Sequence, residues 1–433
     1  MPHAQSMEIF EHHESQVRSY CRSFPAIFER AGGTYLWDTD GHRYVDLLCG
    51  AGALNYGHNP RPIVQAVTNY LADGGPIQSL DLYTSAKAEF LSRFSSEILA
   101  PRGLGDFVVQ FPGPAGTLAV EAAMKLARKV TGRTNVIAFR GGFHGASLGS
   151  LAATTSPVLR GAAGIPLSGV TILPYGSTGV PGMVDALKRE LRATGHVPPP
   201  AAILLETVQG EGGLSVASPT WLAEVRRIAD RIGALVIVDD IQAGCGRTGT
   251  FLSFEHVPDF QPDMVCLSKS LSGMGLPMAA LLIRRDRDVW APGEHNGTFR
   301  GHNLAFVAGS AALDYWADAS FVRHVTELAT KIESDIAELA RQLPVGTAVP
   351  VGRGSWSGLR FADAELASEI RAELFGARII AETCGGGHVL KLMPPLTITR
   401  AEWSAVVGRL SEVVLDTTRR SQPGDYLDLR VPA

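Results

Sequence analysis

The two stretches Ala234-Leu-Val-Ile-Val-Asp239 and Met264-Val-Cys-Leu-Ser-Lys269 decide the fold of this chain. Each begins with a short apolar run, which predicts a buried strand, and each ends on a charged residue. A lysine at the tip of a buried strand is costly unless it has a chemical task, although a lone one is most often simply solvated. A partly desolvated amine can react with an aldehyde, and an aspartate on a neighbouring strand can hold a positively charged heteroaromatic nitrogen.

Length and composition restrict the class of protein. A chain of 433 residues is long enough for two domains or for one large α/β domain with appendages. The net charge of −4 argues against a nucleic-acid partner or a polybasic membrane contact. The five cysteines form no C-x-x-C pair, which is typical of proteins from a reduced cytosol.

The termini and the apolar runs predict a cytoplasmic protein. Residues 1–6 lack a basic segment followed by an apolar one, so we expect no signal peptide. No apolar run approaches the ~18–20 residues that a membrane-spanning helix needs. We therefore expect neither a membrane nor a nucleic acid as partner.

Strands and helices alternate through the middle of the chain, which predicts a mostly parallel sheet covered on both faces. The character changes near residue 320, where a long amphipathic helix is followed by strands of a smaller α+β unit. We expect residues 1–55 to join this small domain, 56–315 to form the large domain and 316–433 to complete the small one. The predicted strands are Phe107–Phe111, Asn135–Phe139, Ala201–Leu205, Ala234–Val238, Met264–Ser268, Gly358–Phe361 and Val389–Leu392, with a hairpin over 34–46; the predicted helices are Leu118–Val130, Pro219–Ile232 and Val322–Leu343.

Two further motifs favour a cofactor with a phosphate group and a flat ring. Gly116 and Thr117 precede a helix, where free backbone N–H groups and the helix dipole can hold an anion. Phe143 follows a strand in the turn Phe143-His144-Gly145, and an aromatic side chain there can stack on a planar ring. Together with Lys269 and Asp239, these motifs predict pyridoxal 5′-phosphate (PLP) as the cofactor.

Other patterns have plainer explanations. Glu206 and Glu211 follow a strand and lie at the sheet edge where ligands bind in such folds, unless they are solvated loop acids. The run 244–249 matches G-x-G-x-x-G, but five residues separate it from the strand, so we interpret it as a flexible loop rather than a dinucleotide site. The adjacent His12, His13 and Glu14 do not suit one metal ion, and no metal site is predicted.

The combined motifs resemble the class III (ω-type) aminotransferases of PLP fold type I over about residues 20–415. The resemblance is carried by Gly116-Thr117, Phe143-His-Gly145, Glu206-Thr-Val-Gln-Gly-Glu211, Asp239-Asp-Ile-Gln-Ala-Gly-Cys-Gly-Arg-Thr-Gly249 and Ser268-Lys269. It implies a large domain with a mostly parallel sheet of the seven-stranded type, and a smaller α+β domain built from both termini. It also implies a homodimer with shared active sites.

The resemblance implies a role for each matching residue. Lys269 looks like the lysine that binds the cofactor and moves a proton, and Asp239 like the partner of the ring nitrogen. Gln242 looks like the group near the ring 3-hydroxyl, Phe143 and His144 lie at the ring, and Glu206 belongs to the same cofactor site. Gly116 and Thr117 look like phosphate ligands, and Thr298 like a phosphate ligand donated by the other subunit.

Within the family, the chain most resembles L-2,4-diaminobutyrate:2-oxoglutarate aminotransferases. The matching stretches are 17–25, 52–58, 212–219 and 293–301. By this resemblance, glutamate donates its amino group to aspartate 4-semialdehyde. Glu211 and Lys391 are the candidates for substrate binding, with Lys391 standing where many relatives carry an arginine that grips a carboxylate.

Alternatives remain at the level of substrate and reaction. Ala146 stands where relatives often carry a second arginine, which favours an aminotransferase of secondary metabolism acting on another amine or aldehyde. Racemases and decarboxylases share the fold, and they differ in needing no oxo acceptor. A non-catalytic binding module is disfavoured by the complete set of Lys269, Asp239 and Gln242.

Overall fold

The computed structural model describes residues 7–176 and 199–421, and a sheet of seven strands forms its centre. The strands from β11 to β6 run parallel, whereas β12 is antiparallel to both of its neighbours. The predicted α/β fold with a mostly parallel sheet is therefore confirmed, and all five strands predicted for this region form. The order is β4 (Phe107–Gly113), β12 (Ala279–Arg284), β11 (Met264–Leu267), β10 (Leu235–Asp239), β7 (Ala202–Leu205), β5 (Val136–Phe139) and β6 (Val170–Leu173).

Helices cover both faces of this sheet because its strands are apolar on both sides. In β10, Leu235 and Ile237 belong to the cluster that contains helix α6 (Gly116–Thr131). The alternate residues, Val236 and Val238, pack in the cluster that contains helix α10 (Pro219–Ile232). Side chains alternate between faces with a period of two, so one strand supplies both cores. Both helices were predicted, and α6 begins two residues earlier than its apolar periodicity indicated.

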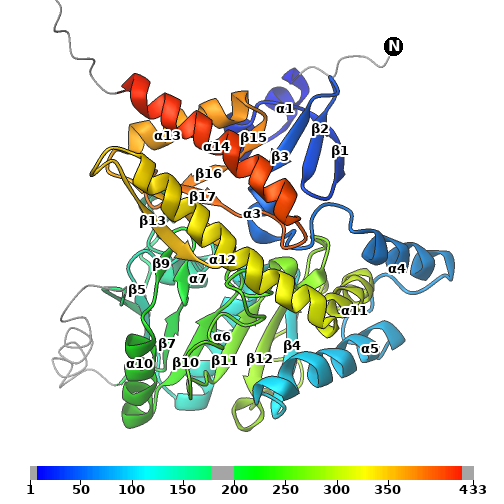
Figure 1. The fold of residues 1–433 in the computed structure, drawn as a ribbon. Helices are drawn as coiled ribbons and strands as arrows, with labels where there is room; N and C mark the ends of the chain where they lie inside the picture. Colours follow the sequence, from blue (N-terminus) through cyan, green and yellow to red (C-terminus); the bar gives the residue numbers. More distant parts are fainter. Residues whose placement is uncertain (1–6, 177–198, 422–433) are drawn as a thin grey trace, which may run out of the picture.

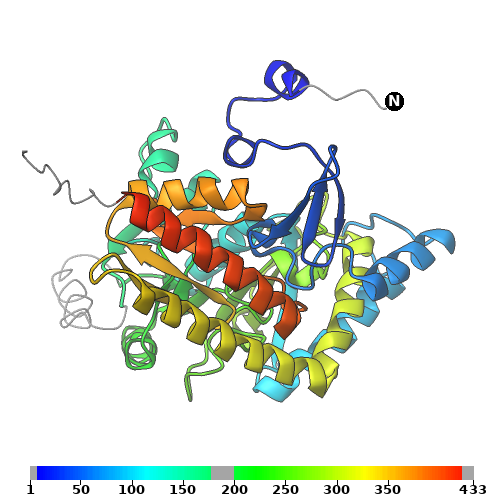
Figure 2. The same cartoon turned by 45° about the horizontal axis from the view of Figure 1, so that its top comes forward.

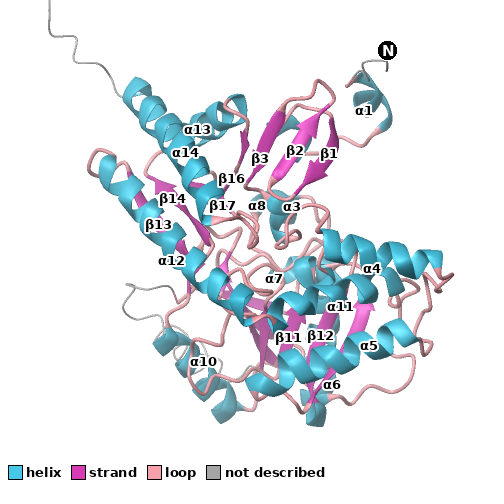
Figure 3. Cartoon of the chain, turned by 45° about the vertical axis from the view of Figure 1, so that its right-hand side comes forward, coloured by secondary structure: helices cyan, strands magenta, loops and turns pink. Residues whose placement is uncertain are grey.

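Three further helices lie together near one edge of the sheet. Helix α11 (Asn303–Ala317) packs against both α4 (Arg61–Ala72) and α5 (Ser85–Arg93). Figure 3 shows these three helices beside strands β11 and β12. Phe306 of α11 and Phe90 of α5 join the larger of the two sheet cores. Helix α11 also packs against the short turn η3 (Lys269–Ser272), which begins at Lys269.

The C-terminal part of the chain forms a separate antiparallel sheet with its own helices. Its core combines residues from α12, α13, α14 and this sheet with Val45 and Leu47 from the N-terminal part. Figures 1 and 2 show α12 and α14 running side by side, with α12 next to the seven-stranded part. The elements are α12 (Ala319–Gln342), β13 (Ala348–Arg353), β14 (Trp356–Phe361), α13 (Ala364–Gly376), β16 (Glu382–Cys384), β17 (Val389–Leu392) and α14 (Arg400–Ser421), with the strand order β13-β14-β17-β16.

The N-terminal strands join a strand from the C-terminal part. Strands β2 (Tyr35–Asp38) and β3 (Arg43–Asp46) form the predicted hairpin. Strand β1 (Phe28–Gly32), which was not predicted, pairs with β2, and β15 (Ile379–Ile380) pairs with β3 in parallel. This pairing supports the division into a small unit of residues 1–55 and 316–433 and a large unit of 56–315. We keep these boundaries as a proposal.

The remaining elements are short and connect the main layers. None of the helices within 7–176 and 199–421 has both the length and the apolar character needed to cross a bilayer. The short elements are α1 (Glu8–His13), α2 (Tyr20–Ser23), α3 (Cys49–Gly52), η1 (Phe94–Leu99), η2 (Ala100–Arg102), α7 (Leu148–Ala153), α8 (Pro157–Gly161), β8 (Val208–Gln209), β9 (Ser215–Val216), η3 (Lys269–Ser272) and η4 (Arg285–Arg287).

The glycine-containing loop 244–249 is packed, which differs from the flexible loop that we expected. Arg247 is completely buried, donates to the carbonyl oxygen of Pro394 at 2.5 Å and also contacts the Asn55 side chain. A buried guanidinium is stable only when its donors have partners, so these contacts fix the loop between the two parts of the chain. Sequence periodicity does not indicate partners that lie so far away along the chain.

Candidate active site

The carboxyl ends of β10 and β11 bring Asp239 and Lys269 to the same edge of the sheet. The two strands are parallel neighbours, with Asp239 opposite Cys266. The chain leaves β11 at Leu267, and Lys269 opens a short 3₁₀ turn with a φ of 51°. A lysine in this left-handed conformation is uncommon and costs free energy, which is typical of a functional position.

The Lys269 amine is prepared for nucleophilic chemistry. Its Nζ donates a hydrogen bond to the Ala51 carbonyl oxygen at 2.8 Å. Burial, with a smaller effect from the positive charge of Lys391, lowers the pKa of Lys269 from 10.5 to about 8, although Glu211 opposes this change. A larger fraction of the amine is therefore uncharged near neutral pH than for a solvated lysine.

Asp239 is fixed by a buried histidine. His144 Nδ1 lies 2.8 Å from Asp239 Oδ2, and both side chains are almost fully buried. Burial alone would lower the pKa of His144, but the hydrogen bond and charge of Asp239 outweigh it and raise that pKa. The Ile241 amide also donates to Asp239 at 3.2 Å. These two contacts fix the orientation of the Asp239 side chain.

Glu206 lies beside this pair and behaves differently. It is buried, and its Oε2 accepts a hydrogen bond from the Phe143 amide at 3.1 Å. Burial raises the pKa of Glu206 to about 8, helped by the negative charge of Asp239 and opposed by His144. The structure thus places Glu206 behind Phe143, where it positions the backbone of the predicted ring-stacking residue.

Helix α6 begins at Gly116 and Thr117, the residues that the sequence predicts as an anion seat. The residue before the helix is Ala115, whose side chain caps none of the first backbone N–H groups. Thr117 Oγ1 lies 2.7 Å from the hydroxyls of both Ser147 and Ser150. Gly145 has a φ of 130°, and a Cβ atom there would lie 2.2 Å from Thr117 Oγ1. The predicted phosphate residues and the predicted turn therefore meet at one helix N-terminus.

Gln242 is held between the two parts of the chain. Its Nε2 donates to the Ala51 carbonyl oxygen at 3.0 Å, the same atom that accepts from Lys269. Gly210 packs so closely that an added Cβ would lie 1.9 Å from Gln242 Oε1. The predicted neighbour of the ring 3-hydroxyl is therefore fixed next to the reactive lysine.

Lys391 occupies an unexpected environment. Its Nζ lies 2.8 Å from Glu211 Oε1 and 2.8 Å from Glu382 Oε1, and its side chain is 0% exposed. Burial alone would lower the pKa of Lys391, but the two carboxylates raise it, so the ammonium stays charged. A substrate carboxylate could reach this ammonium only if Glu211 or Glu382 moved aside. The sequence analysis did not predict a role for Glu382. The feature that could have indicated one is its place as the single acidic residue in the mostly apolar run 379–384.

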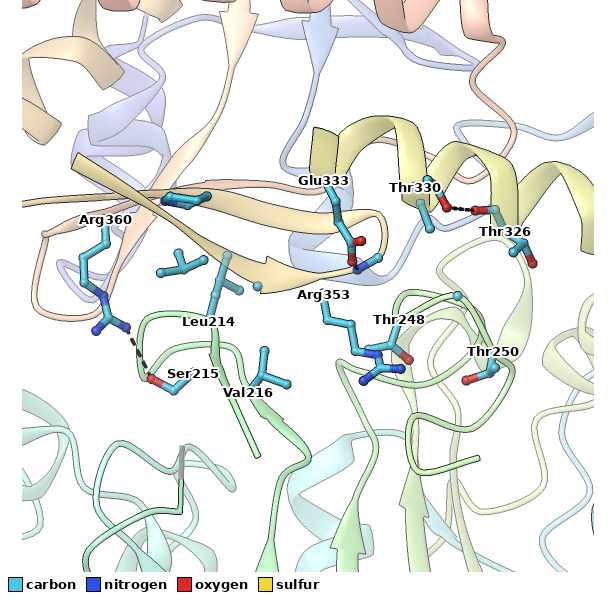
Figure 4. Close-up of a pocket in the computed structure, with 16 residues that line it drawn as sticks. Leu214, Ser215, Val216, Thr248, Thr250, Thr326, Thr330, Glu333, Arg353 and Arg360 are labelled. Atoms are coloured by element: carbon cyan, nitrogen blue, oxygen red, sulfur yellow. Dashed lines mark hydrogen bonds between the residues drawn. The ribbon is translucent and has the colours of Figure 1, made fainter. Parts of the chain in front are cut away.

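Two cavities of similar size open near the small unit. Phe143 and Glu211 line one of about 740 Å³, which adjoins the site. The other, of about 760 Å³, lies between α12, strands β9, β13 and β14, and the loop 248–250 (Figure 4). None of the predicted site residues lines the second cavity, so the first marks the candidate active site.

Thr298 contacts a different segment of the chain. It is exposed, and its carbonyl oxygen accepts a hydrogen bond from the Gln78 side chain. Its predicted role concerns a second subunit and stays a prediction. The other ten predicted site residues come together around one edge of the sheet. The sequence did not predict Glu382, the Ala51 carbonyl or the serines beside Thr117, because distant segments supply them.

Comparison with known proteins agrees with this arrangement. Residues 17–414 match the family model described as class-III aminotransferase. A diaminobutyrate–2-oxoglutarate transaminase of Vibrio cholerae is 48% identical over 413 residues, which cover 95% of this chain and 100% of that protein. One of Halalkalibacterium halodurans is 48% identical over 396 residues, covering 90% and 92%. An uncharacterized aminotransferase of Sinorhizobium fredii is also 48% identical, covering 90% and 88%.

Solved structures show the same fold. The ornithine aminotransferase of Toxoplasma gondii, with PLP at partial occupancy in its active site, has a TM-score of 0.83 at 25% identity and covers 96% of this chain and 94% of its own. The acetylornithine aminotransferase of Elizabethkingia anophelis has a TM-score of 0.77 at 26% identity, covering 95% and 98%.

Proposed function

Because this chain belongs to the class-III aminotransferases, we propose that it transfers an amino group between glutamate and aspartate 4-semialdehyde, with L-2,4-diaminobutyrate and 2-oxoglutarate as the products. The observation that carries this choice of substrate is the identity of 48% with two diaminobutyrate–2-oxoglutarate transaminases along nearly the whole of both chains. The resemblance extends through the candidate site.

As a class-III aminotransferase, the protein uses pyridoxal 5′-phosphate. This cofactor supplies an aldehyde that takes up amines and a ring that withdraws electrons from the reacting carbon. The residues present fit this cofactor. The Lys269 amine with its lowered pKa, the buried Asp239 carboxylate and the uncapped N-terminus of α6 surround one position. We propose that Lys269 attaches the aldehyde, Asp239 pairs with the ring nitrogen, and Gly116 and Thr117 bind the phosphate.

The other site residues orient these groups. We propose that Phe143 stacks on the ring, with Glu206 holding its backbone and His144 holding Asp239. Gln242 lies where it can reach the ring hydroxyl. Burial lowers the pKa of Lys269 to about 8, so its amine can remove a proton from the reacting carbon and return it nearby.

We also propose a homodimer that works in the cytosol. Support comes from exposed apolar side chains near Thr298, which are Ile77, Leu82, Tyr83 and Phe299. An apolar patch of this kind on a soluble protein is typical of a subunit interface. All five cysteines are free, which agrees with a reducing compartment.

A half-reaction tests the proposed function. The purified PLP form is mixed with L-2,4-diaminobutyrate, L-glutamate, L-ornithine or 4-aminobutyrate, and the cofactor absorbance is followed. Rapid conversion by diaminobutyrate and glutamate alone is the expected result. Conversion by glutamate without diaminobutyrate would favour the aminotransferase of secondary metabolism suggested by Ala146. Turnover without any oxo acceptor would indicate a racemase or a decarboxylase and contradict the proposal.

A further inference from the structure

The second cavity, of about 760 Å³, has no part in the proposed reaction, and it lies where the two units of the chain meet (Figure 4). Helix α12 and strands β13 and β14 come from the small unit, whereas β9 and the loop 248–250 come from the large one. The turn between β13 and β14 packs closely on that loop, since a Cβ atom at Gly354 would lie 2.7 Å from the carbonyl carbon of Thr248. The two units therefore build the wall of this cavity together.

Two polar groups that line this cavity lack a partner within the described residues. The Thr248 side chain is 5% exposed, and its hydroxyl has no hydrogen-bond partner there. The half-buried Arg353 guanidinium makes neither a hydrogen bond nor an ion pair with that part of the chain. Burial lowers the pKa of Arg353, although the charge of Glu333 opposes this change. Because unpaired buried donors cost free energy, both groups favour a ligand that accepts hydrogen bonds.

A second guanidinium faces the cavity from the same pair of strands. Arg360 on β14 is opposite Val349, which lies four residues before Arg353 on β13. Side chains alternate along a strand, so both arginines lie on one face of the sheet, about 13 Å apart along the strands. In Figure 4, the apolar Leu214 and Val216 lie between them. The cavity therefore has a cation at each end and an apolar middle.

Arg360 keeps donors available for a ligand. One of its nitrogens donates to the Gly213 carbonyl oxygen at 2.8 Å and to Ser215 Oγ at 3.3 Å. A guanidinium carries five N–H donors, and Arg360 forms no ion pair inside the described ranges. Arg360 and Ser215 also line the cavity beside Phe143 and Glu211. A ligand bound to Arg360 would thus contact a wall that both cavities share.

The charges that line the cavity define the chemistry of the ligand. Glu333 supplies the one carboxylate among the lining residues, and its Oε1 accepts a hydrogen bond from the Gly354 amide at 2.5 Å. Burial and the charge of Arg353 lower the pKa of the neighbouring His256, so this imidazole adds no positive charge near neutral pH. Two guanidinium groups and one carboxylate match a ligand with two carboxylates and one ammonium.

We propose that this cavity binds an acidic amino acid, at a site separate from the active site. One carboxylate of the ligand pairs with Arg353 and the Thr248 hydroxyl, and the other pairs with Arg360. The ammonium of the ligand faces Glu333, and its short hydrocarbon chain lies in the apolar middle of the cavity. The inference goes beyond the proposed function and does not depend on it, because residues outside the reaction build the site.

Calorimetric titration with L-glutamate and glutarate tests this site. The holoenzyme is first treated with aminooxyacetate, which caps the cofactor aldehyde so that glutamate cannot react. The wild type should bind one L-glutamate per chain, and more tightly than glutarate, which lacks the ammonium. Arg353→Gln should raise the Kd of both ligands by at least tenfold, as expected for losing a charged hydrogen-bond donor. Arg341→Gln, at an exposed position on α12, is the matched control and should change neither Kd.

A second variant tests the same end of the cavity without removing a charge. Thr248→Val keeps the shape of the side chain and removes the hydroxyl that has no partner, so the fold should be as stable as before. The Kd of L-glutamate should rise several-fold. Thermal unfolding of each variant without ligand checks that the loss of binding does not come from a loss of fold.

Glu333→Gln separates recognition of the ammonium from a general attraction of anions. The variant keeps an acceptor for the Gly354 amide and removes the negative charge. The Kd of L-glutamate should rise by about tenfold, whereas that of glutarate should fall because a repelling charge is gone. Three outcomes would overturn the site: no binding of L-glutamate to the capped wild type, binding that Arg353→Gln leaves unchanged, or a change of the same sign for both ligands in Glu333→Gln.

Discussion

At the scale of single residues, the sequence predicted the candidate reactive groups but not the residues that contact them. Asp239 and Lys269 were predictable because each ends an apolar run, and parallel strands bring such ends together. The bond between His144 and Asp239 joins residues 95 positions apart, and Glu382 approaches Lys391 from a neighbouring strand. Neither contact has a local pattern, so the pKa values in the site follow from the fold.

One prediction at this scale concerns Lys269 and pH. Below its pKa the side chain is an ammonium that cannot attack an aldehyde, and above it the amine is free. The rate at which PLP attaches to the apoprotein should therefore rise with pH through about 8 rather than 10.5. Lys391→Met removes a positive charge that lowers the pKa of Lys269, so the midpoint should move to higher pH. Stopped-flow absorbance over a pH series measures both.

Two further measurements check the predicted pH dependence of Lys269. A midpoint near 10.5 in the wild type would mean that burial does not act on this amine. Lys331→Met, on helix α12, removes an equal charge from a partly buried pair with Asp335. It should leave the midpoint unchanged.

At the scale of elements, apolar periodicity located the strands and helices well and their ends less well. Helix α10 has the predicted bounds, whereas α6 begins at Gly116 rather than Leu118. The first turn of a helix need not face the core, so Gly116 and Thr117 add nothing to the apolar pattern. The same two residues are the predicted anion seat, so the helix end with the predicted function was also the less predictable one.

The element-scale prediction uses the close contact between Gly145 and Thr117. Gly145→Ala places a methyl group 2.2 Å from Thr117 Oγ1 at a φ of 130°. We expect the affinity for PLP to fall by at least tenfold, and stability to fall by about 1–3 kcal/mol because of backbone strain. Titration of the apoprotein with PLP and thermal unfolding measure the two effects.

Gly132→Ala is the matched control at the other end of α6. Its φ of 66° is also left-handed, but nothing lies within 4 Å of the added Cβ. It should therefore cost stability without weakening PLP binding. Equal losses of PLP affinity in both variants would contradict the assignment of the seat.

At the scale of the whole molecule, the pairing of β15 with β3 places strands from both ends of the chain in one four-stranded sheet. The two ends thereby form one unit beside the seven-stranded sheet. The candidate site lies where these units meet, since Ala51, Glu211 and Lys391 come from different segments. Composition and local pattern indicated the two units of the chain. They could not indicate which surface one subunit presents to another, because that surface is built from segments that come together only in the fold. The segment of Gln78 contacts that of Thr298, and both expose apolar side chains.

The last prediction follows from the proposal that Thr298 serves the partner's site. Lys269→Ala should be inactive, and Thr298→Glu should bind PLP poorly because it opposes the phosphate with a negative charge. A hybrid dimer of the two contains one site with both Lys269 and Thr298 intact if Thr298 acts across the interface. Co-expression of the two chains should then restore about a quarter of wild-type activity, since half of randomly assorted dimers are hybrids with one good site. No recovery would place Thr298 in its own subunit's site, and Thr326→Glu, an exposed threonine on α12, should be active alone.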